Sequence, residues 1–385
     1  MGPTSLKVVL LVGALALAVP VVLGVLVARR PGRLRTRILH GVGVALAVLA
    51  SQVLAVGALG LALNRDLTLF PTWGSVVDAV NADPSDALAQ VGIAPQQDGL
   101  GLGPDQLKSV RTKGYALHHK QPKGAAGVYR DYVVTGPKSG VTKKVVVWLP
   151  PGYDSGQSVA NLPVMMVLGG AYVSLDWTVD FLYFGEEASR LIAAKKVKPF
   201  IAVFPDINVQ APQDTECVDY PSGVLAYSWL STDIPHWVTQ TFHSSTDRRR
   251  WSVQGWSLGG YCAAKLQASD PGRFVAAAAV QGYFEPEPDG TTGALKLDLM
   301  RSAALRNKAS VSRLIRNKTP RDQLRLLAIS SPSDAQSYDQ TAAFGRAVAG
   351  RPGVRVVMVP GQGHTLAAWL GTQEQVLPFL LNHQP

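Results

Sequence analysis

The sequence contains little of what metal-dependent and nucleotide-dependent proteins need. Only two of its 385 residues are cysteine, and no group of cysteines and histidines has the spacing of a metal site. Neither a phosphate-binding loop nor a dinucleotide-binding glycine pattern occurs, and no repeat or low-complexity tract is present. We therefore expect a globular protein that works without a metal or a cofactor.

Acidic residues are missing from the first part of the chain, where no Asp or Glu precedes Arg65. The net charge of +10 is concentrated there, because six basic residues lie beside apolar runs: Lys7, Arg29, Arg30, Arg33, Arg35 and Arg37. Charge placed in this way is typical of membrane topology, so it does not indicate a nucleic-acid partner.

Two long runs lack charge altogether, and they predict a two-helix transmembrane hairpin within residues 1–64. Residues 8–28 and 41–63 are 21 and 23 residues long, and about 20 apolar residues are enough to span a membrane. The intervening "RRPGRLRTR" predicts a cytoplasmic turn, with the rest of the chain outside the cytoplasm. A cleaved signal peptide and two buried core helices are the alternatives to this multi-pass cell-membrane anchor.

The rest of the chain predicts a juxtamembrane linker and then an α/β domain. Residues 65–127 are rich in Gly, Pro and Gln, whereas strands and helices alternate over residues 128–385. Alternation of this kind predicts a mostly parallel sheet with helices on both faces. The eight expected strands are 128–135, 143–150, 162–170, 199–206, 250–255, 275–282, 324–330 and 354–360.

The stretch "GWSLGG" predicts a catalytic nucleophile. Ser257 lies between Gly255 and Gly259, and the pattern follows an expected strand and opens an expected helix. In that setting the serine sits on a sharp turn at a helix N-terminus, where the dipole favours negative charge. The alternative is an ordinary serine that caps the helix.

A base and an acid are expected later in the chain, in the order Ser, acid, His. His364 follows a late strand, in the glycine-containing loop "PGQGHTLAAW". Asp334 is the first acid after strand 324–330, with Asp339 and Glu285 as second and third choices; Asp334 could instead cap the next helix.

An oxyanion hole needs two backbone N–H donors beside the nucleophile. One should be the amide of Leu258, which directly follows Ser257. The other should come from the turn after the strand that ends in paired glycines, which places it at Ala171 or Tyr172.

Five motifs in this order, "LPPGYD", "VLGG", "GWSLGG", "DPGRF" and "GQGH…AAW", resemble the Putative esterase family of α/β-hydrolases. That family includes esterase D, enterochelin esterases and the mycobacterial mycolyltransferases. The resemblance covers roughly residues 128–382, and "DTEC" is similar to membrane-anchored actinobacterial members. It implies an α/β-hydrolase fold with about eight strands, acyl-ester chemistry and the same Ser257, Asp334 and His364.

The chain departs from the mycolyltransferases in places that concern specificity. Their oxyanion loop reads Asp-Gly-Leu-Arg, where this chain has residues 169–172 as "GGAY", and their acid is Glu rather than Asp334. Trp369 matches an aromatic residue after their histidine. Tyr172, Trp256 and Trp369 are therefore candidates for substrate contact, without mycolate or trehalose specificity being carried over.

The sequence leaves two further questions undecided: whether the two cysteines are bridged, and what the basic segment 285–322 contacts. Cys217 and Cys262 form an even count that permits a disulfide outside the cytoplasm, and the alternative is one buried and one exposed thiol. Residues 285–322 are implied by the resemblance to form a small lid. Its many Lys and Arg residues indicate either a solvated helix face or contact with anionic lipid headgroups.

Together these features predict a membrane-anchored, extracytoplasmic serine esterase or acyltransferase that acts through an acyl-serine intermediate. An acyl-ester lipid or glycolipid is the expected substrate, membrane lipids are the expected partners, and the oligomeric state is left open. The alternatives are a catalytically inactive, hydrolase-like binding protein of the cell envelope and a serine peptidase that uses the same triad on amides.

Overall fold

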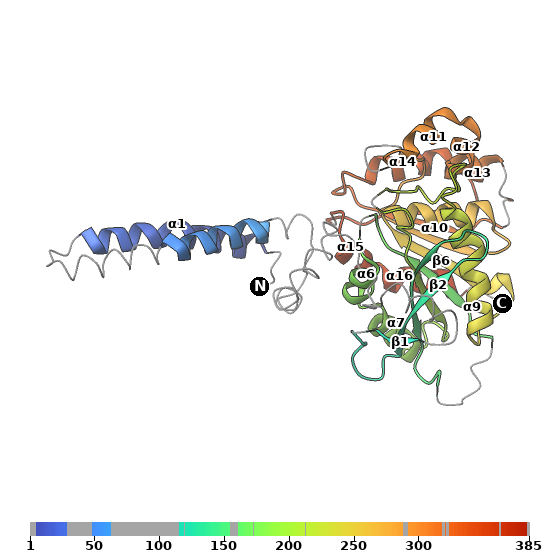
Figure 1. The fold of residues 1–385 in the computed structure, drawn as a ribbon, viewed down its shortest axis with the longest axis horizontal. Helices are drawn as coiled ribbons and strands as arrows, with labels where there is room; N and C mark the ends of the chain where they lie inside the picture. The colour runs from blue at the N-terminus through green and yellow to red at the C-terminus, as the bar shows by residue number, and fades with distance from the viewer. Residues whose placement is uncertain are drawn as a thin grey trace. The chain divides into compact units, whose positions relative to one another are not determined.

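The computed structural model describes residues 5–28, 48–62, 115–118, 120–154, 161–171, 173–211, 213–287, 292–317, 320, 323–361 and 363–382. The chain divides into two compact units, Met1–Asp83 and Pro84–Pro385, which are described separately (Figure 1). The predicted cytoplasmic turn, residues 65–114 of the predicted linker and Tyr172 lie outside the described residues.

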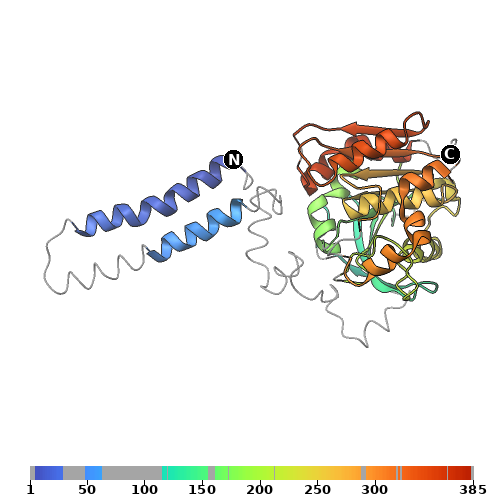
Figure 2. The same cartoon turned by 90° about the horizontal axis from the view of Figure 1, so that it is seen from above.

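The N-terminal unit contains two helices, α1 (Leu6–Ala28) and the helix of residues 48–62. They run side by side (Figure 2), and the Ser51 hydroxyl donates a hydrogen bond of 2.6 Å to the Ala16 carbonyl. Across the part of the chain that the structure describes, no helix has both the length and the apolar character required to cross a membrane. The transmembrane hairpin expected from the sequence is therefore not found there.

A nine-stranded sheet organises the larger unit, within the residues that the structure describes. The strand order is β1-β2-β3-β5-β4-β6-β7-β8-β9. The pairs from β1 to β5 (β1–β2, β2–β3 and β3–β5) are antiparallel, and all pairs from β5 to β9 are parallel. The bounds are β1 (Ala116–Leu117), β2 (Val128–Thr135), β3 (Thr142–Leu149), β4 (Val164–Leu168), β5 (Ile201–Pro205), β6 (Trp251–Trp256), β7 (Ala276–Val280), β8 (Leu326–Ser330) and β9 (Val354–Met358).

The eight expected strands correspond to β2 through β9, and the mostly parallel sheet is confirmed. Strand β1 was missed because two exposed residues are too short to show a periodic pattern. It pairs with β2, so the end of the predicted linker contributes to the sheet.

Helices cover the sheet because its central strands are apolar on both faces. Every residue of β4, β5, β6, β7 and β8 is buried, and α10 and α16 both pack against β6 and β7. Outside the predicted lid, the helices include α6 (Leu175–Leu182), α7 (Phe184–Ala193), α9 (Ile234–Thr241), α10 (Leu258–Ser269), α14 (Tyr338–Ala347), α15 (Leu366–Gly371) and α16 (Gln373–Leu381). Within its described residues, the predicted lid contains three short helices, α11 (Leu295–Arg301), α12 (Ala303–Ala309) and α13 (Val311–Asn317).

The sheet topology gathers the functional loops at one edge. Strands β6, β7, β8 and β9 are neighbours in the sheet in the same order as in the chain, and all are parallel. Their carboxyl ends therefore lie at the same edge, where open α/β sheets place their ligands.

Candidate active site

The turn between β6 and α10 holds Ser257 in a strained backbone conformation. Its φ of 57° and ψ of −124° are unusual for a residue with a side chain. A Cβ on Gly255 would lie 2.2 Å from the Gly259 carbonyl oxygen, and a Cβ on Gly259 would lie 2.2 Å from that of Leu168. Glycine is thus required at both positions for the serine to rise above the sheet.

The structure brings Ser257, His364 and Asp334 together. The Nε2 atom of His364 is 3.0 Å from the Ser257 Oγ, and its Nδ1 atom is 3.0 and 3.2 Å from the two carboxylate oxygens of Asp334. One ring nitrogen can therefore accept the hydroxyl proton while the other donates its N–H to the carboxylate. The side chain of His364 is 14% exposed, so the group remains accessible.

Asp334 is held as an oriented carboxylate. It is fully buried, and it accepts hydrogen bonds from the backbone N–H of Gln336 and from the N–H and hydroxyl of Ser337. Burial alone would raise the pKa of Asp334, but the hydrogen bonds from His364 and Ser337 outweigh it and lower the pKa. Asp339, the second choice, lies in the first turn of α14 instead.

The third choice for the acid, Glu285, follows β7 and is half-buried. The carboxylate that meets the imidazole belongs to Asp334, whose neighbours in the turn after β8 fix its direction. The backbone turn that starts at Asp334 also leads into α14, because the Tyr338 N–H donates to the Asp334 carbonyl. Asp334 therefore both begins the turn that leads into a helix and contacts the catalytic base.

The expected oxyanion donors lie on the two segments that flank the nucleophile. Leu258 is the first residue of α10. In the facing loop, a Cβ on Gly170 would lie 3.5 Å from the Ser257 Cβ and 2.8 Å from the Trp256 ring, so this loop passes directly beside the serine. Ala171 follows and is half-buried. Two backbone amides can thus approach one oxygen at Ser257.

The two tryptophans expected near the substrate occupy different environments. The Trp256 ring lies 4.9 Å from the His364 ring, centroid to centroid, and is tilted by 35°. Trp369 is fully buried, and its indole N–H donates to the Gln254 side chain at 3.0 Å. Trp256 therefore belongs to the site, whereas Trp369 supports the core and the expectation of substrate contact is not met for it.

Cys217 and Cys262 form a disulfide, with their Cα atoms 5.8 Å apart. The bridge joins the loop after β5 to α10, five residues beyond Ser257. Lys265, one turn later, donates to the Cys217 and Glu216 carbonyls, and burial lowers the pKa of Lys265 to about 7. The "DTEC" loop is therefore fastened covalently and by hydrogen bonds to the nucleophile-bearing helix.

Glu216 in this loop was not singled out in the sequence. Its carboxylate accepts from the Tyr283 hydroxyl at 2.9 Å and from the Glu287 N–H at 3.0 Å. Burial raises its pKa well above the ordinary value, and the nearby Asp214 adds to this effect. The carboxyl group thus ties the loop after β5 to the segment that leads into the lid.

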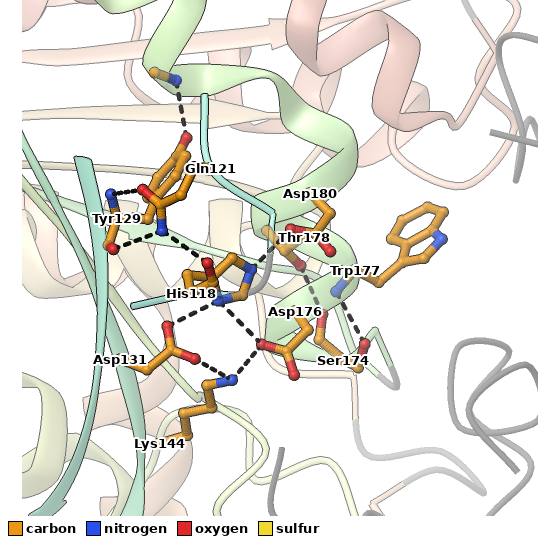
Figure 3. A network of polar contacts seen from close by, with 11 residues as sticks. His118, Gln121, Tyr129, Asp131, Lys144, Ser174, Asp176, Trp177, Thr178 and Asp180 are labelled. Carbon is orange, nitrogen blue, oxygen red and sulfur yellow. Dashed lines mark hydrogen bonds and ion pairs between the residues drawn. The ribbon is translucent and has the colours of Figure 1, made fainter. Parts of the chain in front are cut away.

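A second cluster of charged groups connects His118 with β2, β3 and α6 (Figure 3), and the sequence did not reveal it. The buried His118 places Nδ1 at 2.8 Å from Asp131 and Nε2 at 2.7 Å from Asp180. Burial alone would lower the pKa of His118, but the hydrogen bonds to Asp131 and Asp180 outweigh it and raise the pKa to about 9. His118 is therefore a cation at neutral pH, with both nitrogens donating.

Lys144 belongs to this cluster, and its ammonium group occupies the place that a metal ion would need. The donor atoms of His118, Asp131 and Asp176 lie within 4.8 Å of one another, as a metal ion requires. However, the Lys144 ammonium lies 2.7 Å from Asp131 and 2.6 Å from Asp176, and a protonated imidazole has no lone pair to offer. The cluster fits an ion-pair network.

The network holds α6 in place beside the catalytic loops. Asp176 and Asp180 belong to α6, which packs against α15, the helix that follows His364. On the other side of α6, Thr178 abuts Gly169 of the oxyanion loop. The sequence signal for this arrangement was a charged residue inside two apolar strands, Asp131 in β2 and Lys144 in β3.

This fold and site define a serine hydrolase of the α/β-hydrolase class. Residues 139–380 match the family described as "Putative esterase", and the chain belongs to this family. It is a carboxylic ester hydrolase with a serine nucleophile.

Solved structures share the fold at low sequence identity. A ferulic acid esterase is 17% identical with a TM-score of 0.59, and the match covers 68% of this chain and 99% of that one. An S-formylglutathione hydrolase from Agrobacterium tumefaciens is 17% identical with a TM-score of 0.58, covering 69% and 99%. A fluorophosphonate-binding serine hydrolase from Staphylococcus aureus is 17% identical with a TM-score of 0.53, covering 66% and 98%.

A curated relative is an uncharacterised protein from Corynebacterium glutamicum. It is 26% identical over 140 residues, which cover 36% of this chain and 32% of the relative. The match thus spans about a third of that protein's length.

Proposed function

We propose that Ser257, His364 and Asp334 cleave acyl esters through an acyl-serine. The observation that carries this proposal is the continuous chain of contacts from the Ser257 hydroxyl through the imidazole to the buried carboxylate. His364 takes the hydroxyl proton as Oγ bonds to the acyl carbon, and the carbonyl oxygen becomes an oxyanion. The amides of Leu258 and Ala171 stabilise that charge.

The second half of the reaction releases the acyl group. Collapse of the first intermediate expels the alcohol, which receives the proton held by His364. An incoming water or hydroxyl then gives its proton to the same imidazole and attacks the acyl carbon. The second intermediate breaks its bond to the Ser257 Oγ, which takes the proton back from His364 as the acyl product leaves. Water gives hydrolysis, and a sugar or lipid hydroxyl gives acyl transfer.

An acyl-ester lipid or glycolipid is the proposed substrate. The lid helix α11 exposes Leu297 and Met300, and basic residues follow on the same lid. A surface that presents apolar and cationic groups together suits a molecule with acyl chains and an anionic headgroup. The 3.0 Å contact between His364 and Ser257 argues against the alternative of an inactive scaffold.

We also propose that the catalytic unit works outside the cytoplasm and that the N-terminal unit anchors it to the cell membrane. Three features support this location: the Cys217–Cys262 disulfide, the apolar sequence of residues 8–28 and 41–63, and the arginines between them. The paired N-terminal helices also expose leucines and valines that water does not favour.

A fluorophosphonate probe tests the nucleophile. The wild type should be labelled at one serine, and Ser257→Ala should not be labelled. Ser333→Ala, which removes an exposed hydroxyl near Asp334, is the matched control and should be labelled like the wild type. Equal labelling of the wild type and Ser257→Ala would remove the proposal.

Turnover measurements separate the reaction types. The proposal expects release of alcohol from model acyl esters, and slower or no cleavage of peptides with matched acyl groups. Feruloyl esters and S-formylglutathione belong in the panel, because the similar structures carry those names. Faster cleavage of peptides than of esters would favour the peptidase.

Cysteine mass spectrometry tests the location. Protein isolated from the cell surface under non-reducing conditions should contain the peptide pair that holds Cys217 and Cys262. Two free thiols in that material, or a catalytic unit protected from protease added to intact spheroplasts, would contradict the extracytoplasmic proposal.

A further inference from the structure

The side chain of Gln281 forms hydrogen bonds to the backbone on both sides of His364. Its Oε1 accepts a hydrogen bond of 3.2 Å from the Thr365 N–H, and its Nε2 donates to the Gly363 carbonyl. The residues directly before and after the catalytic base are thus bound to one buried amide. Neither bond involves the imidazole itself.

The same amide also reaches the nucleophile segment. The Trp256 indole N–H donates to Gln281 Oε1 at 2.9 Å, and Trp256 directly precedes Ser257. The Trp256 ring in turn lies against the His364 ring. One side chain therefore connects the segment that carries the nucleophile to the loop that carries the base.

The backbone of Gln281 has an unusual conformation that sets the direction of this side chain. Its φ of 50° lies in the left-handed region that residues other than glycine avoid, and its N–H donates to the Ile329 carbonyl at 2.6 Å. Strain that is retained at a buried residue beside a catalytic site is a recurrent feature of functional positions. The residue follows β7, between the strands that lead to Ser257 and Asp334.

We propose that Gln281 is a positioning residue that sets the distance and direction of His364 relative to Ser257. The inference rests on the proposed function of the triad, since it assigns Gln281 no contact with substrate. A loop that contains Gly361 and Gly363 has little stiffness of its own, so these two hydrogen bonds fix the backbone that carries the imidazole, while Asp334 orients the ring. Catalysis is sensitive to displacements of about 1 Å in such groups.

A second buried glutamine provides a matched control. Gln254 also accepts from a tryptophan indole, that of Trp369, and exchanges hydrogen bonds with Gln373. It lies on β6 and is as deeply buried as Gln281, but these partners belong to α15 and α16 rather than to the residues adjoining His364. The same substitution at both positions separates general loss of packing from loss of positioning.

The test compares Gln281→Met with Gln254→Met in the full chain. We expect Gln281→Met to lower kcat on a model ester by about 10- to 100-fold with KM little changed, because an interaction that orients the base acts in the transition state. Gln254→Met should lower the melting temperature at least as much and keep kcat within about threefold. Gln281→Asn, which keeps the amide but is one methylene shorter, should give a smaller loss of kcat.

A double-mutant cycle with His364→Ala makes the test specific. In that background the imidazole is gone, so adding Gln281→Met should cost less than about twofold more of the residual rate. An equal loss in both backgrounds, a change in KM alone, or unchanged kcat in Gln281→Met and Gln281→Asn would overturn the inference. If His364→Ala itself retained wild-type activity, the proposed triad would fail, which is a different result from failure of Gln281.

Discussion

Two histidines of this protein each contact carboxylates, yet their chemistry differs. His364 has a carboxylate on Nδ1 and a serine hydroxyl on Nε2, and it is partly exposed. His118 has carboxylates on both nitrogens and is fully buried. The first arrangement leaves a lone pair that can take a proton, whereas the second requires that both nitrogens already carry one.

The partner of the second nitrogen therefore decides the role. A single carboxylate orients an imidazole and lets it cycle between its two protonation states during the reaction. A pair of carboxylates fixes the charged form, which then serves as a structural cation that links β2 to α6 (Figure 3). Contact with a carboxylate alone does not distinguish the catalytic histidine from the structural one.

The largest expected difference between the two histidines is in catalysis. His364→Ala should lower kcat on a model ester by about 10⁵- to 10⁶-fold, because the Ser257 hydroxyl loses its base. The melting temperature should move little. Steady-state kinetics and thermal unfolding of one preparation give both values, and a loss of less than about tenfold would mean that His364 is not the base.

Asp334→Asn tests the orienting carboxylate. The amide keeps the shape of the side chain but favours the wrong tautomer of His364, so kcat should fall by about 10⁴-fold. Asp339→Asn on α14 is the matched control and should leave kcat unchanged. Similar losses in the two variants would show that the acid has been assigned to the wrong residue.

His118→Ala should act mainly on stability. It removes the cation that the buried Asp131 and the half-buried Asp180 share, while Lys144 still pairs with Asp131, so the free energy of unfolding should fall by about 3 kcal/mol. Urea unfolding measures this loss, and His236→Ala, at an exposed histidine, should cost almost nothing. A marginal effect of His118→Ala would contradict the charged network.

The smallest effect is the contribution of His118 to the pH dependence of stability. Its pKa rises from 6.5 in the unfolded chain to about 9 in the folded protein, so the folded state binds the proton more tightly. Its contribution, on the order of 3 kcal/mol, is complete below pH 6.5 and is lost as the pH rises through about 9. The lowered pKa of Lys265 acts in the opposite direction over this range, so the decline is taken from the difference between the unfolding curves of the wild type and of a neutral replacement between pH 6 and 10.

The same curves for a neutral replacement provide the check. His118→Gln should be less stable at pH 6 and should lose less stability between pH 6.5 and 9, because the titrating group has been removed. An identical decline in the wild type and in His118→Gln would assign the alkaline loss to another group.

The sequence predicted the parts of the site that depend on local pattern. Gly255 and Gly259 lie within two residues of Ser257, and the steric need for glycine can be recognised from that short stretch alone. His364 and Asp334 could be chosen because each follows an apolar strand in the order that this architecture requires. The parallel sheet followed from the alternation of strands and helices.

The parts that were missed depend on contacts between distant segments. The sequence predicts Gln281 only as the end of a strand, since nothing in "VAAAAVQG" shows which carbonyl or N–H its amide will contact. His118 lies within the predicted linker, where the sequence gives no sign of its role because its partners lie 13 and 62 residues away. Trp369 was misjudged for the same reason, since an aromatic near the base can point to the core or to the substrate.

The order of the strands determines when the active site can form during synthesis. Ser257, Gln281, Asp334 and His364 follow four successive neighbours in the sheet, and the contact between base and nucleophile bridges 107 residues. During synthesis the serine emerges from the ribosome long before its partner, and pairing of β9 must precede any reactivity. A half-made chain is therefore harmless to the esters around it.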